Sequence, residues 1–277
     1  MQDPHRTKSL SSAQKATLGL GAAVLASTGL ALAHYAARVE PEQLGITTPK
    51  LDKQPPVKVL FFSDLHLGPM YDHTHLKRIV DSINAQKPDL ILFGGDFFAK
   101  FLRDAHELPF RWLVHQLRRL EAPLGKYAVL GNHDVRQGAQ PFFELLFSEG
   151  GFRILEDELV QPAPGITICG LNPYSNGRIL REMPSDGWRV VLCHMPDKCR
   201  YLNLKNVDLV LSGHSHAGQI RLPIITRMIL PPGGKMYPYG LFYPQNTDAQ
   251  LFVSRGIGMS GVPFRFLAPP ELVLFGK

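Results

Sequence analysis

The chain has 277 residues, of which 44% are hydrophobic and 19% charged, an ordinary globular composition with room for one α/β domain and a full core. The formal net charge of +6 suits an anionic substrate or a lipid surface, but it is too diffuse to indicate nucleic-acid binding. Three scattered cysteines, Cys169, Cys193 and Cys199, exclude a disulfide framework.

The N-terminal 37 residues contain an uncharged stretch, residues 16–33, that is rich in Ala, Leu and Gly and follows Arg6, Lys8 and Lys15. It has two interpretations. One is a single membrane-spanning anchor that extends to Ala37, and the other is a signal peptide that ends in Ala31-Leu32-Ala33. The length of the stretch favours the anchor, and the basic residues before it place the N-terminus in the cytoplasm and the main domain outside.

Residues 38–56 hold four prolines among polar residues and predict a linker, so that the folded domain occupies residues 57–277. Apolar runs predict strands at 57–62, 90–93, 127–130, 166–170, 190–193, 207–211, 219–222, 251–254 and 272–275. Apolar residues at helical spacing predict helices at 75–86, 110–120 and 141–147. A βαβα first half and a strand-rich second half predict two packed sheets flanked by helices, in one domain.

Five of these strands are followed at once by side chains that can bind a metal ion. They are Asp64 with His66, then Asp96, then Asn132-His133-Asp134, then His194, and finally His214 with His216. Because ligand sites of α/β sheets form at the carboxyl ends of strands, we expect all five segments to converge on one rim. The paired residues around Leu65 and Ser215 point to the same side in extended backbone.

The ligand types are Asp, Asn and His without Cys, which suits Mn²⁺ and also Fe or Zn²⁺ in a site of higher coordination number. The candidates are too many for one ion but suit two ions that share a bridging carboxylate. Two such ions about 3.5–4 Å apart can clamp a phosphoryl group and generate a hydroxide nucleophile.

The sequence resembles the calcineurin-like metallophosphoesterase family in these motifs, over residues 57–276. The motifs are Asp64-Leu65-His66, Gly95-Asp96, Gly131-Asn132-His133-Asp134, His194 and Gly213-His214-Ser215-His216. The resemblance implies a four-layer α/β/β/α sandwich of two mixed β-sheets with a dinuclear centre. It assigns one metal to Asp64, His66, Asp96 and His216, and the other to Asp96, Asn132, His194 and His214, with Asp96 bridging.

The same resemblance makes His133 a neighbour of the phosphate rather than a ligand, with Asp134 orienting it. The expected reaction is in-line attack of a metal-bridging hydroxide on phosphorus, with imidazolium His133 stabilising the transition state or protonating the leaving oxygen. Arg255 and Arg136 are candidate phosphate contacts, and for both an ordinary solvated surface position is the alternative.

The segments 218–223 and 253–258 are similar to a branch of membrane-anchored or exported bacterial phosphodiesterases, which includes enzymes like the UDP-2,3-diacylglucosamine pyrophosphohydrolases. This predicts a location at the bacterial inner membrane by a single N-terminal anchor, with export as the alternative. The apolar, interrupted stretch 223–243 predicts either a packed loop or an acyl-chain wall or membrane contact, and the latter favours a lipid-linked substrate. A phosphatase for soluble nucleotides or proteins and a non-catalytic metal-binding scaffold are the competing functions.

Overall fold

The computed structural model describes residues 44–68, 71–106, 108–222, 224–261 and 264–276, with a few residues between 11 and 27. The chain divides into two units, Met1–Glu40 and Pro41–Lys277. The predicted anchor or signal segment lies almost wholly outside the described residues. Within the described part of the chain, no helix combines the length and apolarity needed to cross a bilayer.

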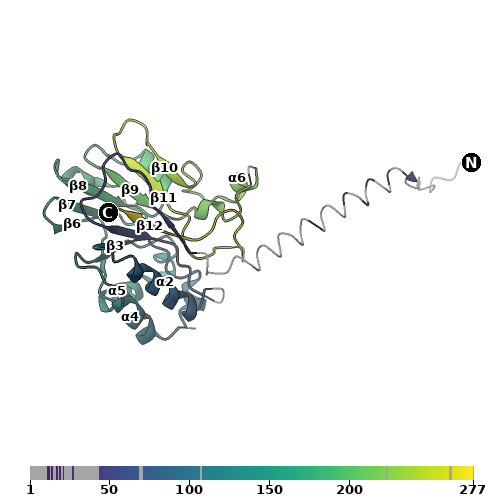
Figure 1. Ribbon diagram of the computed structural model, residues 1–277, viewed down its shortest axis with the longest axis horizontal. Helices are drawn as coiled ribbons and strands as arrows, with labels where there is room; N and C mark the ends of the chain where they lie inside the picture. The colour runs from purple at the N-terminus through teal and green to yellow at the C-terminus, as the bar shows by residue number, and fades with distance from the viewer. Residues whose placement is uncertain are drawn as a thin grey trace, which may run out of the picture. The chain divides into compact units, whose positions relative to one another are not determined.

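Two six-stranded mixed sheets form the centre of the second unit (Figure 1). The first sheet has the order β1 (Gly45–Thr47), β12 (Glu271–Phe275), β2 (Val59–Phe62), β3 (Leu90–Phe93), β4 (Lys126–Ala128) and β5 (Arg153–Ile154). The second has the order β10 (Gly240–Phe242), β11 (Gln250–Val253), β9 (Leu209–Ser212), β8 (Trp188–Leu192), β7 (Ile166–Gly170) and β6 (Glu158–Ala163). Strands β2 to β5 are parallel to one another, as are β7, β8, β9 and β11.

The central strands are continuous apolar runs because both of their faces are covered. In β2, Leu60 and Phe62 pack on the helix side, whereas Val59 and Phe61 point between the two sheets. Strand β8 of the second sheet has the same alternation, with Val190 facing the first sheet. The space between the sheets is therefore an aliphatic and aromatic core. Its packing fixes the positions of the strand ends of one sheet relative to those of the other.

Helices cover the outer face of the first sheet, namely α2 (His73–Ala85), α3 (Phe101–Asp104), α4 (Phe110–Arg118) and α5 (Gln140–Glu149) (Figure 1). The outer face of the second sheet carries 3₁₀ turns, η3 (Arg178–Glu182) and η4 (Pro196–Arg200), rather than long helices. The remaining elements are η2 (Arg136–Gly138), η5 (His216–Gly218) and α6 (Ile225–Ile229). The predicted arrangement of two mixed sheets flanked by helices is confirmed.

Two sequence predictions are wrong in part. Residues 44–56 of the predicted linker belong to the folded unit, because β1 pairs with β12 and Leu51 is buried between the sheets. Residues 219–222 do not form a strand. Gln219 adopts a left-handed φ of 57°, and Ile220 makes only a single bridge, to Phe266.

Candidate metal centre

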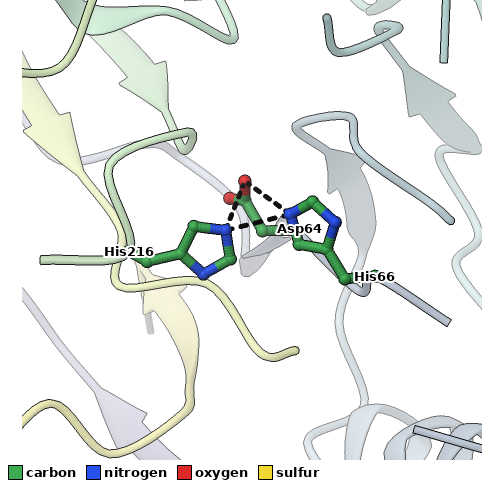
Figure 2. Close-up of side chains that lie close together, drawn as sticks. All are labelled: Asp64, His66 and His216. Carbon is green, nitrogen blue, oxygen red and sulfur yellow. Dashed lines mark hydrogen bonds and ion pairs between the residues drawn. The ribbon is translucent and has the colours of Figure 1, made fainter. Parts of the chain in front are cut away.

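The five polar segments predicted to converge do meet at one rim, at the carboxyl ends of β2, β3, β4, β8 and β9. The first group of donors consists of Asp64, His66 and His216 (Figure 2). The Nε2 atoms of the two histidines lie 2.9 Å apart, and Asp64 Oδ1 lies 3.9 Å from His66 Nε2 and 3.5 Å from His216 Nε2. Figure 2 shows both rings turned toward the carboxylate from opposite sides. All three residues are buried, so a divalent cation is the chemical partner that fits this set of donors.

The second group of donors consists of Asp96, His194 and His214. Asp96 Oδ2 lies 3.2 Å from His194 Nε2, and the amide oxygen of Asn132 lies 3.2 Å from the same nitrogen. Asp96 Oδ2 is also 3.6 Å from His66 Nε2 of the first group. One carboxylate thus stands between both groups, which is the arrangement a bridging ligand requires.

The backbone at these residues lies in a region that side chains rarely adopt. Asp64, His66, Asp96, His214 and His216 have φ angles of 55°, 43°, 60°, 68° and 51°. Each such conformation is stored strain of roughly 1–3 kcal/mol, which the surrounding structure must maintain and which is typical of functional sites. It turns the side chains out of the strand direction and onto a common point.

Two glycines allow the carboxylates to come so close to neighbouring backbone. A Cβ atom at Gly131 would lie 2.0 Å from Asp96 Oδ1, and one at Gly213 would lie 2.1 Å from Asp64 Oδ2. Neither distance is physically possible. The motif glycines are thus needed for ligand placement as well as for the turn itself.

Backbone carbonyls determine which nitrogen of several imidazoles remains free for a ligand. His194 donates from Nδ1 to Gly94 O at 2.7 Å, which leaves Nε2 facing Asp96. His214 donates from Nε2 to Pro232 O at 2.9 Å, which leaves Nδ1 free. Such second hydrogen bonds fix the tautomer and the orientation of metal-binding histidines.

Burial controls the charge of the candidate ligands. Burial lowers the pKa of His66 to about 3 and that of His214 to about 4, so both are neutral at pH 7, the form that binds a cation. At His194 burial also disfavours the charged ring, but the adjacent Asp96 outweighs it and raises the pKa to about 10. Burial raises the pKa of Asp64 to about 6. Two carboxylates beside buried histidines with strongly shifted pKa values are typical of a functional site.

His133 lies beside the candidate ligands and is oriented by the backbone, not by Asp134 as the resemblance implied. Its Nδ1 donates to Ala99 O at 2.9 Å, and its ring meets that of His66 edge to face at 5.0 Å. Asp134 instead accepts from the backbone N–H groups of Gly131, Asp96 and Phe97, at 2.7–2.9 Å. It ties the β3 and β4 loops together, so the prediction that it orients His133 is wrong.

Arg265 was missed by the sequence analysis. This side chain is almost completely buried, and it donates to the carbonyls of Arg255, Gly258 and Ala268 as well as to Nδ1 of His216 at 3.1 Å. Burial lowers its pKa to about 10, so it stays charged at pH 7. The only sequence signal was a lone arginine inside an apolar run, which by itself does not indicate contact with a ligand.

A cavity of about 480 Å³ opens above the two groups. Its lining includes polar side chains from the two groups and their neighbours, namely His66, Asp96, Asn132, His133, His214 and His216. It also includes apolar or aromatic side chains, namely Tyr174, Met195, Ile220, Ile229, Pro231 and Pro232. The cavity therefore suits a molecule that carries a phosphoryl group next to an apolar part.

The two predicted arginine contacts have different positions. Arg136 is exposed and lines the cavity. Arg255 does not line it, because its guanidinium pairs with buried Glu271 at 2.6 Å and lies over the ring of Tyr239 at 4.9 Å. This position supports a structural role for Arg255 and gives no support to the predicted phosphate contact.

Comparison with known proteins gives a consistent result. Residues 57–218 match the family described as "Calcineurin-like phosphoesterase". An uncharacterised metallophosphoesterase of Bacillus subtilis is 35% identical over 79% of this chain and 78% of its own length. A Helicobacter pylori relative, also named as an uncharacterised metallophosphoesterase, is 32% identical, and the alignment takes in 85% of this chain but 63% of that protein. UDP-2,3-diacylglucosamine pyrophosphatase of Chlamydia muridarum is 26% identical over 87% of this chain and 91% of its own length.

Proposed function

The chain belongs to the calcineurin-like phosphoesterase family and is thus a phosphoester hydrolase, and from this premise we propose that it cleaves phosphodiester or pyrophosphate bonds in a lipid-linked or membrane-proximal substrate. The observation that carries the proposal is the position of Asp96. Its carboxylate lies within 3.6 Å of histidines from both buried donor groups, and it lines a cavity that has both polar and apolar lining residues.

We assign the two cations to overlapping sets of residues. Asp64, His66, Asp96 and His216 form one set, and Asp96, Asn132, His194 and His214 form the other. The oxygen and nitrogen donors suit Mn²⁺ first, with Fe and Zn²⁺ as alternatives. When bound, such cations polarise phosphoryl oxygens and lower the pKa of water.

The chain's own residues supply the rest of the chemistry. The hydrogen bond from His133 Nδ1 to Ala99 leaves Nε2 free, and His133 lines the cavity. Protonated at Nε2, this ring donates a proton to the oxygen that leaves phosphorus. Arg136, which lines the same cavity, would bind a second phosphate of the substrate.

Three observations support a lipid-linked substrate. The apolar side chains that line part of the cavity offer a surface for an acyl chain. The N-terminal sequence offers a membrane anchor, which would place the enzyme at the bacterial inner membrane. The Chlamydia relative is named as a pyrophosphatase of a diacylated nucleotide sugar.

A pair of chromogenic substrates tests the chemistry. With Mn²⁺ present, we expect hydrolysis of bis-p-nitrophenyl phosphate well above that of p-nitrophenyl phosphate. His133→Ala should lower kcat by roughly 100-fold or more, because it removes the proton donor. The metal content should not change, since His133 is not assigned as a ligand. His115→Ala, at an exposed position of α4, is the matched control. A fully metal-loaded protein without diesterase activity would refute the proposal.

A second comparison tests the substrate class. A diacylated UDP-sugar in mixed micelles should be cleaved with a higher kcat/KM than the same UDP-sugar without acyl chains. Preference for the soluble compound would favour the alternative, a phosphatase for soluble nucleotides. Equal turnover by the full chain and by a chain without residues 1–37, in membranes, would count against a role of the N-terminal segment.

A further inference from the structure

A small apolar projection stands beside the metal cavity. It comprises Ile224 and α6, which projects from the body of the domain in Figure 1. Ile224 and Met228 are each 77% exposed, Ile225 is 42% exposed and Ile229 is 43% exposed. Four large apolar side chains within six residues form a contiguous patch, in contrast to the scattered exposed hydrophobic residues found on any soluble protein.

The outward orientation of this patch is fixed by Thr226 of α6. An ordinary surface helix turns its apolar residues toward the core. In α6, Thr226 points inward instead and donates from its hydroxyl to Ile220 O at 2.9 Å and to Leu222 O at 2.7 Å. Its methyl group packs so closely on Gly218 that a Cβ atom there would lie 2.9 Å away. The helix is held with its apolar side toward solvent.

The chain segment that carries the patch is basic. No Asp or Glu occurs in the sequence from residue 209 to residue 247, whereas Arg221, Arg227 and Lys235 are present and exposed. Apolar side chains flanked by exposed basic residues are the composition of segments that bind anionic lipid surfaces. The patch complements such a surface in both apolarity and charge.

The patch is also connected to the site. Ile229 lines the metal cavity, and the segment between α6 and the candidate ligand His216 is only eight residues long, residues 217–224. The backbone of Arg221 is anchored by a hydrogen bond to Phe266 O at 2.9 Å. A surface that contacts the patch will therefore lie close to the cavity.

A bilayer fits the patch better than a protein does. Four side chains on one turn fall far short of the roughly 800 Å² that each partner buries in a stable protein–protein interface. A five-residue helix, roughly 7.5 Å long, can lie in the plane of the interface, where the apolar face of such helices is buried ~5–10 Å deep.

We propose that Ile224 and α6 insert into the interfacial region of an anionic lipid bilayer and thereby hold the mouth of the metal cavity at the membrane surface. The proposal deepens the proposed function, on which it rests for the membrane-proximal substrate. It adds a second point of membrane contact, in the catalytic domain itself.

Because the N-terminal segment can hold the full chain on vesicles by itself, the test measures the depth of α6 rather than total binding. The three native cysteines are buried, so a thiol introduced by Met228→Cys can be labelled selectively with an environment-sensitive nitrobenzoxadiazole dye. The matched control carries the label at Tyr201→Cys, whose native side chain is 79% exposed and far from α6 in sequence.

The labelled full chain is mixed with vesicles of phosphatidylglycerol and phosphatidylcholine. We expect the dye at position 228, but not at 201, to shift to the blue and to be quenched by lipids that carry a shallow spin label. Vesicles of phosphatidylcholine alone should give a smaller shift. Equal exposure of both dyes to aqueous iodide would overturn the proposal. So would a shift at 228 that grows with protein concentration in the absence of lipid, since that reports self-association.

A double variant, Ile224→Ser with Met228→Ser, gives a functional test. Neither residue lines the cavity, so hydrolysis of bis-p-nitrophenyl phosphate should match that of the unaltered protein. Turnover of a diacylated substrate embedded in vesicles should fall about tenfold. Unchanged turnover would refute the proposal. If the unaltered protein does not hydrolyse bis-p-nitrophenyl phosphate, the proposed function is refuted instead. The dye measurement then decides the role of α6.

Discussion

Replacing Arg265 is expected to weaken both the fold and the metal site. The guanidinium satisfies three backbone carbonyl oxygens, those of Arg255, Gly258 and Ala268, and it holds the ring of His216. Arg265→Met fills the space but leaves these acceptors without donors. Each buried acceptor left unpaired costs roughly 1–3 kcal/mol, and after local relaxation we expect a loss of about 4 kcal/mol in the free energy of unfolding.

The metal site should respond separately. Loss of the contact to His216 Nδ1 removes the group that orients a candidate ligand, and such changes typically lower metal affinity about 10–100-fold. Arg265→Lys keeps the charge but cannot reach all three carbonyls, so it should lose roughly half as much stability. Arg111→Met, at an exposed position of α4, serves as the matched surface control and should stay within about 0.5 kcal/mol of the unaltered protein.

Urea unfolding measures the free energy of unfolding. Calorimetric titration of the metal-free protein with Mn²⁺ measures the affinity for Mn²⁺. Unfolding of Arg265→Met at the same urea concentration as the control would show that Arg265 does not stabilise the fold. A fall in stability with unchanged Mn²⁺ affinity would show that Arg265 has no influence on the ligand it touches.

Four further predictions concern the fold and the metals. Asp72→Ala removes the side chain that caps α2 and should cost about 1 kcal/mol at pH 7 in urea unfolding. Burial acts to raise the pKa of Asp72, but hydrogen bonds from Thr74 and His75 outweigh it and lower the pKa. The difference in the free energy of unfolding between the unaltered protein and Asp72→Ala should therefore be constant above about pH 5 and shrink as the pH falls below about 4. Phe143→Ala opens a cavity within the ring cluster on the helix side and should cost about 3–5 kcal/mol by the same assay, and a smaller loss would mean that the cluster collapses to fill it. Asp96→Asn weakens the shared ligand, so metal analysis should find fewer than two ions per chain and kcat should fall at least about 100-fold, whereas unchanged stoichiometry would contradict a bridging role. Chelation with EDTA should lower Tm, and Mn²⁺ at about 100 times its Kd should restore roughly 2.7 kcal/mol, whereas an unchanged Tm would argue against cations bound only in the folded state.

The sequence predicted the central strands well, because burial on both faces makes them continuous apolar runs. Edge strands escaped prediction for the opposite reason. Strand β1 is three residues long and only partly buried, and nothing local distinguishes it from a linker. The wrongly predicted strand at 219–222 shows a second limit of the apolar pattern. The pattern does not reveal that Gln219 has a left-handed φ, which interrupts the extended backbone there.

Residue type and position after a strand were enough to predict which side chains converge. They were not enough to assign roles that depend on contacts across the fold. Asp134 follows His133 in sequence, yet it accepts from the N–H group of Gly131 in its own loop and from those of Asp96 and Phe97 in the neighbouring β3 loop. Arg255 and Arg265 are ten residues apart, and only the tertiary structure reveals that Arg265 is the one that touches the site.

Each donor group draws on both sheets, and this has a consequence for the integrity of the chain. Asp64, His66 and Asp96 come from the first sheet, whereas His194, His214 and His216 come from the second. Neither sheet carries a complete donor set. The chain passes from the first sheet to the second between β5 and β6, and it returns to the first sheet with β12. The site thus lies between the two sheets, as the site of some two-subunit enzymes lies between the subunits, but here one chain supplies both sheets. A chain divided between β5 and β6 should therefore recover cation binding only when both fragments associate, and the cations would contribute to that association.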